Sequence, residues 1–120
     1  MRYIMFVAVD PDPDGSGDPL PSVDEWFDEI NADGTWVIGE RLRPVSDARL
    51  VRVRNGQVLV TDGAFTESKE WIAGFDILEC DDLDEAIAIA ARHPQANGGK
   101  LELRPFWTDE DWQRTRTTGS

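Results

Sequence analysis

Apolar residues fall into short runs along the chain, and the spacing within each run predicts whether it forms a strand or a helix. Tyr3–Val9 is continuously apolar and rich in β-forming residues, which is typical of a strand buried on both faces. Three further runs of strand length are bounded by turn residues or prolines. They predict strands over Trp36–Glu40, Trp71–Leu78 and Leu101–Arg104.

Two segments have the helical pattern, and each begins with a capping signal. Ser22 is followed three positions later by Glu25, which is a capping box, and Gly34 offers a left-handed end to this first helix. Its predicted buried face carries Val23, Trp26, Phe27 and Ile30. Asp82 caps the second helix, which ends near Pro94. The apolar stripe of the second helix consists of Leu83, Ala86, Ile87, Ala90 and Ala91.

A β-hairpin is predicted between the second and third of these strands. Asn55 and Gly56 are the preferred pair for a two-residue type I′ turn, and this turn fixes the register of the flanking strands. Arg52 and Arg54 then lie on one face, and we expect the opposite face to be the buried side of a half-buried ladder. That opposite face carries Val51, Val53, Val58 and Val60.

The order of the predicted elements defines the fold class. Without the hairpin it is βαββαβ, the order of a ferredoxin-like α+β fold. We expect one domain over residues 1–106, an acidic loop at 10–21 between the first strand and the first helix, and a tail over 107–120 that frays from Thr117. Two helices cover only one face of such a sheet. Because the first strand is apolar on both sides, we expect the other face to join a second copy in a homodimer.

The size and charge of the chain argue against several classes of protein. With 120 residues and 13.5 kDa, the chain has room for one hydrophobic core. Its net charge of −12 argues against nucleic-acid binding and against docking on anionic membranes. It has no apolar run of transmembrane length, no signal-peptide pattern and a single cysteine that cannot form an internal disulfide. We therefore expect a cytoplasmic protein.

The acidic residues are concentrated near the N-terminus. Nine of the 24 lie between Asp10 and Asp33, a stretch without lysine or arginine. Asp10–Gly15 matches the first half of a calcium-binding loop, but Pro21 stands at the twelfth position, where such loops carry a bidentate glutamate. We therefore expect a solvated loop and no metal ion. The chain has no P-loop, zinc or Ser-His-Asp pattern either, so we expect no cofactor.

The segment Thr61–Glu70, with the sequence TDGAFTESKE, resembles the signature of the YCII-related or DGPF-domain family. The resemblance continues through the hairpin, through Gly39–Leu42 and into the C-terminal half at Asp82–Ala86 and Gly99–Arg104. It covers about Trp36 to Pro105. Ala64 departs from the family pattern, which has proline there, so the turn loses a fixed φ angle.

The resemblance implies a ferredoxin-like unit that dimerises into an α/β barrel. Some relatives are enzymes, such as dehydrochlorinases, for which a His–Asp pair has been proposed. That pair is not carried over, because the only imidazole here, His93, comes late in the chain at the end of the second helix. Family members with the DGPF motif often occur beside extracytoplasmic-function sigma factors, which implies an accessory role.

The signature loop is the predicted site of any chemistry. Asp62 is the candidate general base, and Lys69 is the candidate cation for an anionic or enolate oxygen. The alternative is structural, with Asp62 accepting hydrogen bonds from turn N–H groups and Lys69 paired with a neighbouring glutamate. The candidate ligand-binding residues are Glu40, Gly63, Phe65, Glu67, Glu70 and Trp71.

The remaining reactive and aromatic side chains have structural interpretations. We expect His93 to be a cation at the C-terminus of the second helix, and Cys80 to be a poor nucleophile because neighbouring acids raise its pKa. Trp26, Trp36 and Trp71 are expected in the core or the dimer interface, unless a cavity lets them line an apolar pocket. The tryptophans of the tail, Trp107 and Trp112, are expected to cover the partner subunit.

Three functional hypotheses follow. The first is a homodimer that binds a small organic molecule near the signature loop. The second is a lyase or isomerase of aromatic or lactone-type substrates that uses Asp62 as its base. The third is a protein partner of an extracytoplasmic-function sigma factor that docks through the acidic loop. A cavity beside Asp62 would favour the first two.

Overall fold

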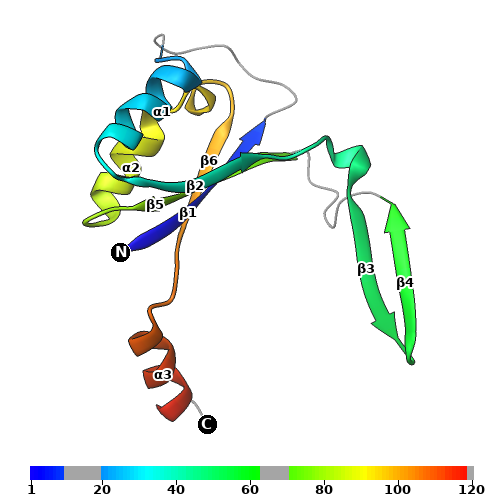
Figure 1. Ribbon diagram of the computed structural model, residues 1–120. Helices are drawn as coiled ribbons and strands as arrows, with labels where there is room; N and C mark the ends of the chain where they lie inside the picture. Colours follow the sequence, from blue (N-terminus) through cyan, green and yellow to red (C-terminus); the bar gives the residue numbers. More distant parts are fainter. Residues whose placement is uncertain (10–19, 63–70, 119–120) are drawn as a thin grey trace.

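The computed structural model describes residues 1–9, 20–62 and 71–118 (Figure 1). The helices and strands follow in the predicted order, with a further helix at the C-terminus. They are β1 (Arg2–Val9), α1 (Val23–Ala32), β2 (Trp36–Arg41), η1 (Val45–Asp47), β3 (Arg49–Arg54), β4 (Gln57–Asp62), β5 (Trp71–Glu79), α2 (Leu83–Ala91), η2 (Pro94–Ala96), β6 (Lys100–Pro105) and α3 (Asp109–Thr118).

The main sheet has the strand order β2-β5-β1-β6, and its neighbouring strands are antiparallel. With α1 and α2 as the two crossovers, this is the ferredoxin-like α+β arrangement that the sequence predicts. Both helices lie on one face of the sheet (Figure 1). The strands β3 and β4 form a separate two-stranded sheet. Among the described residues, no helix is long and apolar enough to cross a membrane.

The capping signals operate as the sequence indicates. The Ser22 hydroxyl accepts a hydrogen bond from the backbone N–H of Glu25 (3.2 Å), and the Asp82 carboxylate accepts one from the N–H of Glu85 (2.8 Å). Gly34 has a φ of 73°, the left-handed conformation that ends α1. Hydrogen bonds between residues a few positions apart therefore define the starts of these two helices.

The core lies between the helices and one face of the sheet. Trp26 of α1, Met5 of β1 and Leu78 of β5 are the largest fully buried side chains. The helix α2 contributes only small buried side chains, Ala86 and Ala90, which let its backbone approach the sheet. Burial of each large side chain stabilises the fold by about 1.5–3 kcal/mol.

The predicted apolar stripe of α2 is partly wrong. Leu83 and Ile87 are each 49% exposed, whereas Ile89, which was not in the stripe, packs partly buried against the core. The indole N–H of Trp26 donates to the carbonyl of Ile89 (2.9 Å), and this bond lies on the side of α2 that faces α1. The helix is thus rotated so that Ala86 and Ala90 face the core, whereas the larger Leu83 and Ile87 face away from it.

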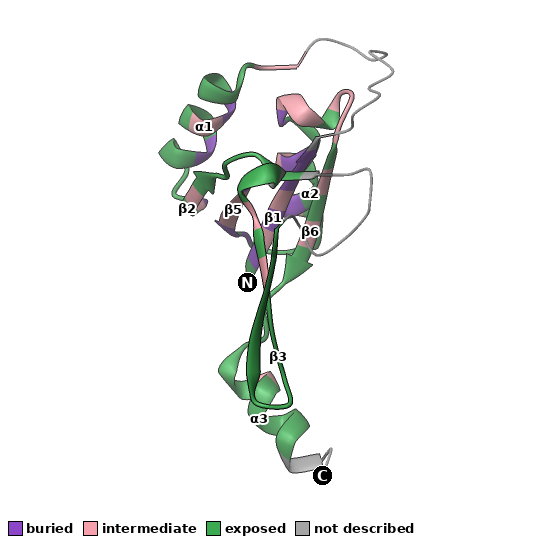
Figure 2. Ribbon diagram, turned by 90° about the vertical axis from the view of Figure 1, so that its right-hand side faces the viewer, coloured by how far each residue is buried: buried purple, intermediate pink, exposed green. Residues whose placement is uncertain are grey.

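The hairpin has the predicted register and turn. Val53 pairs with Val58, and Asn55 and Gly56 have φ values of 53° and 77°, as a type I′ turn requires. The expectation that its valine face is half-buried is not met within one chain. The four valines are 58–67% exposed, because the hairpin extends away from the main sheet and no element among the described residues covers it (Figure 2).

The C-terminal tail contains a helix that the sequence analysis did not predict. The hydroxyl of Thr108 accepts from the N–H of Asp111 (3.0 Å) at the start of α3, which continues to Thr118 past the expected fraying point. Trp107 and Trp112 make an edge-to-face contact at 5.8 Å, yet they are 64% and 44% exposed. Like the hairpin, α3 is exposed along its described length (Figure 2).

Candidate functional site

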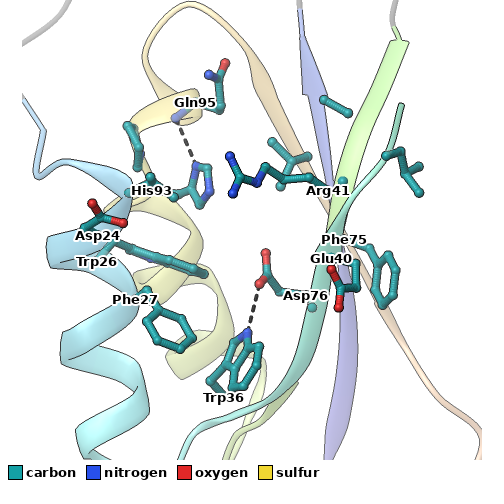
Figure 3. Close-up of a pocket in the computed structure, with 17 residues that line it drawn as sticks. Asp24, Trp26, Phe27, Trp36, Glu40, Arg41, Phe75, Asp76, His93 and Gln95 are labelled. Carbon is teal, nitrogen blue, oxygen red and sulfur yellow. Dashed lines mark hydrogen bonds between the residues drawn. The ribbon is translucent and has the colours of Figure 1, made fainter. Parts of the chain in front are cut away.

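A pocket of about 670 Å³ lies between α1, η2 and the helix-covered face of β2 and β5 (Figure 3). This volume is in the range of sites for small molecules. Its walls combine aromatic rings with side chains that can donate or accept protons or carry charge. Among these residues are Trp26, Phe27, Trp36, Arg41, Asp76 and His93.

Two glycines create the room for this pocket. On the helix-facing side of the β2–β5 ladder, Gly39 pairs with Asp76 and Arg41 pairs with Gly74. A Cβ atom on Gly39 would collide with the Asp76 carboxylate, and one on Gly74 would lie 2.9 Å from the carbonyl oxygen of Glu40. Because both positions lack a side chain, the strands leave a hollow in which the Asp76 carboxylate sits.

Asp76 lies in the middle of β5, beside the buried Met5 of β1. Its Oδ1 accepts a hydrogen bond from the indole N–H of Trp36 (3.0 Å). Burial raises the pKa of Asp76, and the hydrogen bond from Trp36 partly opposes this rise. A carboxyl group of this kind can exchange a proton with a bound molecule.

His93 follows α2 and lies on the opposite wall of the pocket, with only 4% of its surface exposed. Its Nδ1 accepts a hydrogen bond from the backbone N–H of Gln95 (3.0 Å), and its ring meets Trp26 edge to face at 4.7 Å. Burial lowers the pKa of His93 to about 4, so the imidazole is neutral at pH 7. Since Nδ1 is an acceptor, Nε2 carries the proton and is a donor.

The expectation of a cationic His93 at the end of α2 is therefore wrong. A buried imidazole without a carboxylate partner is more stable neutral, and its side chain instead caps the short helix η2. The basic residue at the end of α2 is the C-cap Arg92, which pairs with Glu29 of α1 at 2.8 Å.

Arg41 is the last residue of β2, and Figure 3 shows its guanidinium group pointing across the pocket toward His93, above Asp76. It has no hydrogen-bond or ion-pair partner among the residues that the structure describes. The guanidinium is charged at any physiological pH. The pocket therefore contains one fixed positive charge, one neutral donor and one carboxyl group with a raised pKa.

The structure does not bring Asp62 to this pocket. Asp62 ends β4 on the hairpin, where its side chain is 87% exposed and pairs with Arg49 at 3.1 Å. Glu40, by contrast, does line the pocket from β2, although its side chain shares the open face of the sheet with Phe75 (Figure 3). Trp71 is the first residue of β5, opposite Val9, and its side chain lies outside the described part. The other predicted site residues, Gly63, Phe65, Glu67, Lys69 and Glu70, lie outside the described residues.

Two further sequence hypotheses can be placed. Cys80 is 3% exposed, and its thiol pKa is raised to about 11, mainly by burial and then by Glu85. The predicted direction is confirmed, with burial as the larger cause. The Asp10–Gly15 calcium-loop match and most of the acidic docking segment fall outside the described residues.

The sequence analysis did not single out Asp76 or Arg41. A signal for Asp76 was available, since it is the one charged residue within the otherwise apolar Trp71–Leu78 run. A lone carboxylate in a central strand has to be accommodated by a neighbour, and Gly39 on the next strand provides that space. Nothing local marks Arg41, because its place in the pocket depends on Gly74 opposite.

Comparison with known proteins agrees with the fold. The model of the YCII-related domain matches residues 1–110. An uncharacterized protein of Rhizobium meliloti (strain 1021) is 40% identical over 68 residues, which is 55% of this chain and 55% of that protein. The chain thus spans about half the length of this curated relative. From the match over residues 1–110, the chain belongs to the family of YCII-related domain proteins.

Proposed function

We propose that the protein binds a small organic molecule in the pocket between α1 and the β2–β5 ladder. The observation that carries this proposal is the convergence of Arg41, Asp76 and His93 on one aromatic-lined hollow. Binding sites for small molecules combine mostly apolar walls with a few polar groups that orient the ligand. The proposed site does not include Asp62, whose exposed side chain lies on the hairpin.

A second candidate function is acid–base catalysis at this site, as in a lyase or isomerase of aromatic or lactone-type substrates. Asp76 would take a proton from a carbon next to a carbonyl group, and the Nε2 proton of His93 would donate to the oxygen that gains charge. The raised pKa of Asp76 and the neutral state of His93 favour these two roles.

The open face of the sheet supports a homodimer as part of the proposal. By register, Ile4 of β1, Ile38 of β2 and Ile77 of β5 share this face, which none of the described helices covers. Phe6 and Phe75 pair on the same face, with Glu40 and Glu102 beside them. An apolar strip with a polar margin is typical of interfaces between identical subunits.

Binding can be tested by screening small organic acids, lactones and phenols for quenching of tryptophan fluorescence, since Trp26 and Trp36 line the pocket. A compound that binds there should lose affinity at least fivefold in both Phe27→Ala and His93→Gln, whereas Asp62→Asn on the hairpin should bind normally. If Asp62→Asn weakens binding and the two pocket variants do not, the binding site lies at the signature loop instead.

Catalysis can be tested separately by NMR, as exchange of carbon-bound protons for deuterium in butenolide lactones that bind. Asp76→Asn should slow this exchange at least about a hundredfold while binding persists. If wild type and Asp76→Asn show equal exchange rates, Asp76 is not an acid–base catalyst and only the binding proposal stands.

A further inference from the structure

We propose that the ligand is a planar organic monoanion whose carboxylate pairs with Arg41. The inference rests on the proposed function and adds the chemical class of the ligand.

Arg41 differs from other surface arginines in its ion pairing. The chain has a net charge of −12, and arginines elsewhere on its surface pair with carboxylates, as Arg43 does with Asp47 at 2.9 Å. Arg41 has no such partner within the described residues, although Asp24, Glu40 and Asp76 line the same pocket. Within the described part of the chain, this cation shares the pocket with the carboxylates of Asp24 and Asp76 but pairs with neither, so it is available to an anionic ligand.

The backbone explains why Arg41 reaches the pocket. Arg41 and Gly74 are cross-strand partners on the helix-facing side, so no side chain stands between the arginine and the hollow. The side chain extends from the sheet, and its guanidinium points toward His93 (Figure 3). A guanidinium group offers two parallel N–H donors, which match the two oxygens of a carboxylate.

The rest of the pocket favours a flat and singly charged molecule. Phe27 and Trp36 meet edge to face at 4.8 Å and, with Trp26, form an apolar wall against which a planar ring can pack. His93 offers one more donor, its Nε2–H, for an oxygen of the ligand. The carboxylates of Asp24 and Asp76 would repel a second negative charge.

A pair of probes of equal shape tests the charge. We expect 2-naphthoate to bind at least tenfold more tightly than neutral 2-naphthamide, as measured by quenching of tryptophan fluorescence and by calorimetry. In Arg41→Gln the naphthoate should fall to the affinity of the amide, whereas the amide should be unaffected. The matched control is Arg43→Gln, two residues further along, which removes an exposed arginine whose partner is Asp47 and should change neither affinity.

The outcomes separate the inference from the function on which it rests. If the amide binds as tightly as the naphthoate, or if Arg41→Gln leaves the preference intact, the anion inference is wrong and the pocket remains a binding site. If neither probe binds at millimolar concentration, both the pocket proposal and the inference are overturned. Circular dichroism and the melting temperature of Arg41→Gln show whether a loss of binding reflects unfolding, and Arg41→Lys then provides a folded variant that keeps the charge but loses the paired donors.

Discussion

The carboxylate of Asp76 occupies the space where a Cβ atom on Gly39 would lie. The two residues are cross-strand partners in β5 and β2, and the carbonyl oxygen of Phe75 is also only 2.7 Å from that Cβ position. The pocket therefore depends on a glycine at one position of one strand. Any larger residue there has to displace the carboxylate or part the strands.

Gly39→Ala should destabilise the fold by about 1–3 kcal/mol, the usual cost of inserting a methyl group into a packed site. The Trp36–Asp76 hydrogen bond should also be lost, with a change in tryptophan emission. A double-mutant cycle with Asp76→Ala, followed by urea denaturation, measures the coupling. We expect the cost of Gly39→Ala to fall by at least about 0.5 kcal/mol in the Asp76→Ala background. In that background the contact with the Asp76 carboxylate is absent, and only the contact with the Phe75 carbonyl oxygen remains. Strict additivity would contradict the contact.

Asp76→Asn should leave stability at pH 7 equal or raise it. Burial raises the pKa of Asp76, so the ionised carboxylate opposes folding at neutral pH, and this penalty disappears when the group is protonated as the pH falls. Asparagine keeps an oxygen that can accept from Trp36 and never ionises. The gain in the melting temperature of the variant should therefore shrink between pH 7 and pH 4. A variant less stable than wild type at pH 7 would show that the charge itself supports the fold.

His93→Gln should flatten the loss of stability in acid. Because burial lowers the pKa of His93 to about 4, the folded protein resists protonation that the unfolded chain accepts near 6.5. Stability is therefore lost as the pH falls from about 6.5 to about 4, by up to about 3 kcal/mol from this group. Asp76 acts in the opposite direction and is present in both proteins, so it cancels in their difference. Parallel stability curves over this range would contradict a buried neutral imidazole.

Ile38→Lys should disrupt the proposed homodimer. Ile38 is 48% exposed on the open face of the sheet, opposite Ile77. The matched control is Ile87→Lys on α2, where the isoleucine is 49% exposed on the helical side of the molecule. Light scattering should give twice the chain mass of 13.5 kDa for wild type and Ile87→Lys, and a smaller mass for Ile38→Lys. A wild-type mass of 13.5 kDa at micromolar concentration would refute the dimer.

The sequence predicts the parts of this structure that local chemistry determines. The caps at Ser22 and Asp82 and the turn at Asn55 and Gly56 are fixed by residues a few positions apart, and all are confirmed. The rotation of α2 is not local, since it follows from how closely Ala86 approaches the sheet.

The candidate site was less predictable for the same reason. Its polar groups come from β2, β5 and the segment after α2, and they meet only because Gly39 faces Asp76 and Gly74 faces Arg41. These pairings require the register of two strands that are 40 residues apart at Trp36 and Asp76. The protonation state of His93 also depends on tertiary structure, because burial beside Trp26 lowers its pKa and keeps the imidazole neutral.

The hairpin has a thermodynamic consequence of its own. Its cross-strand hydrogen bonds join only β3 to β4, and the four exposed valines add no burial against the main sheet within one chain. Opening the hairpin therefore leaves the β2-β5-β1-β6 ladders intact. The amide hydrogens of Val51 and Val60 should exchange with solvent through local opening, orders of magnitude faster than those of Met5 and Leu78, which exchange through global unfolding. We therefore expect two cooperative units of very different stability on one chain.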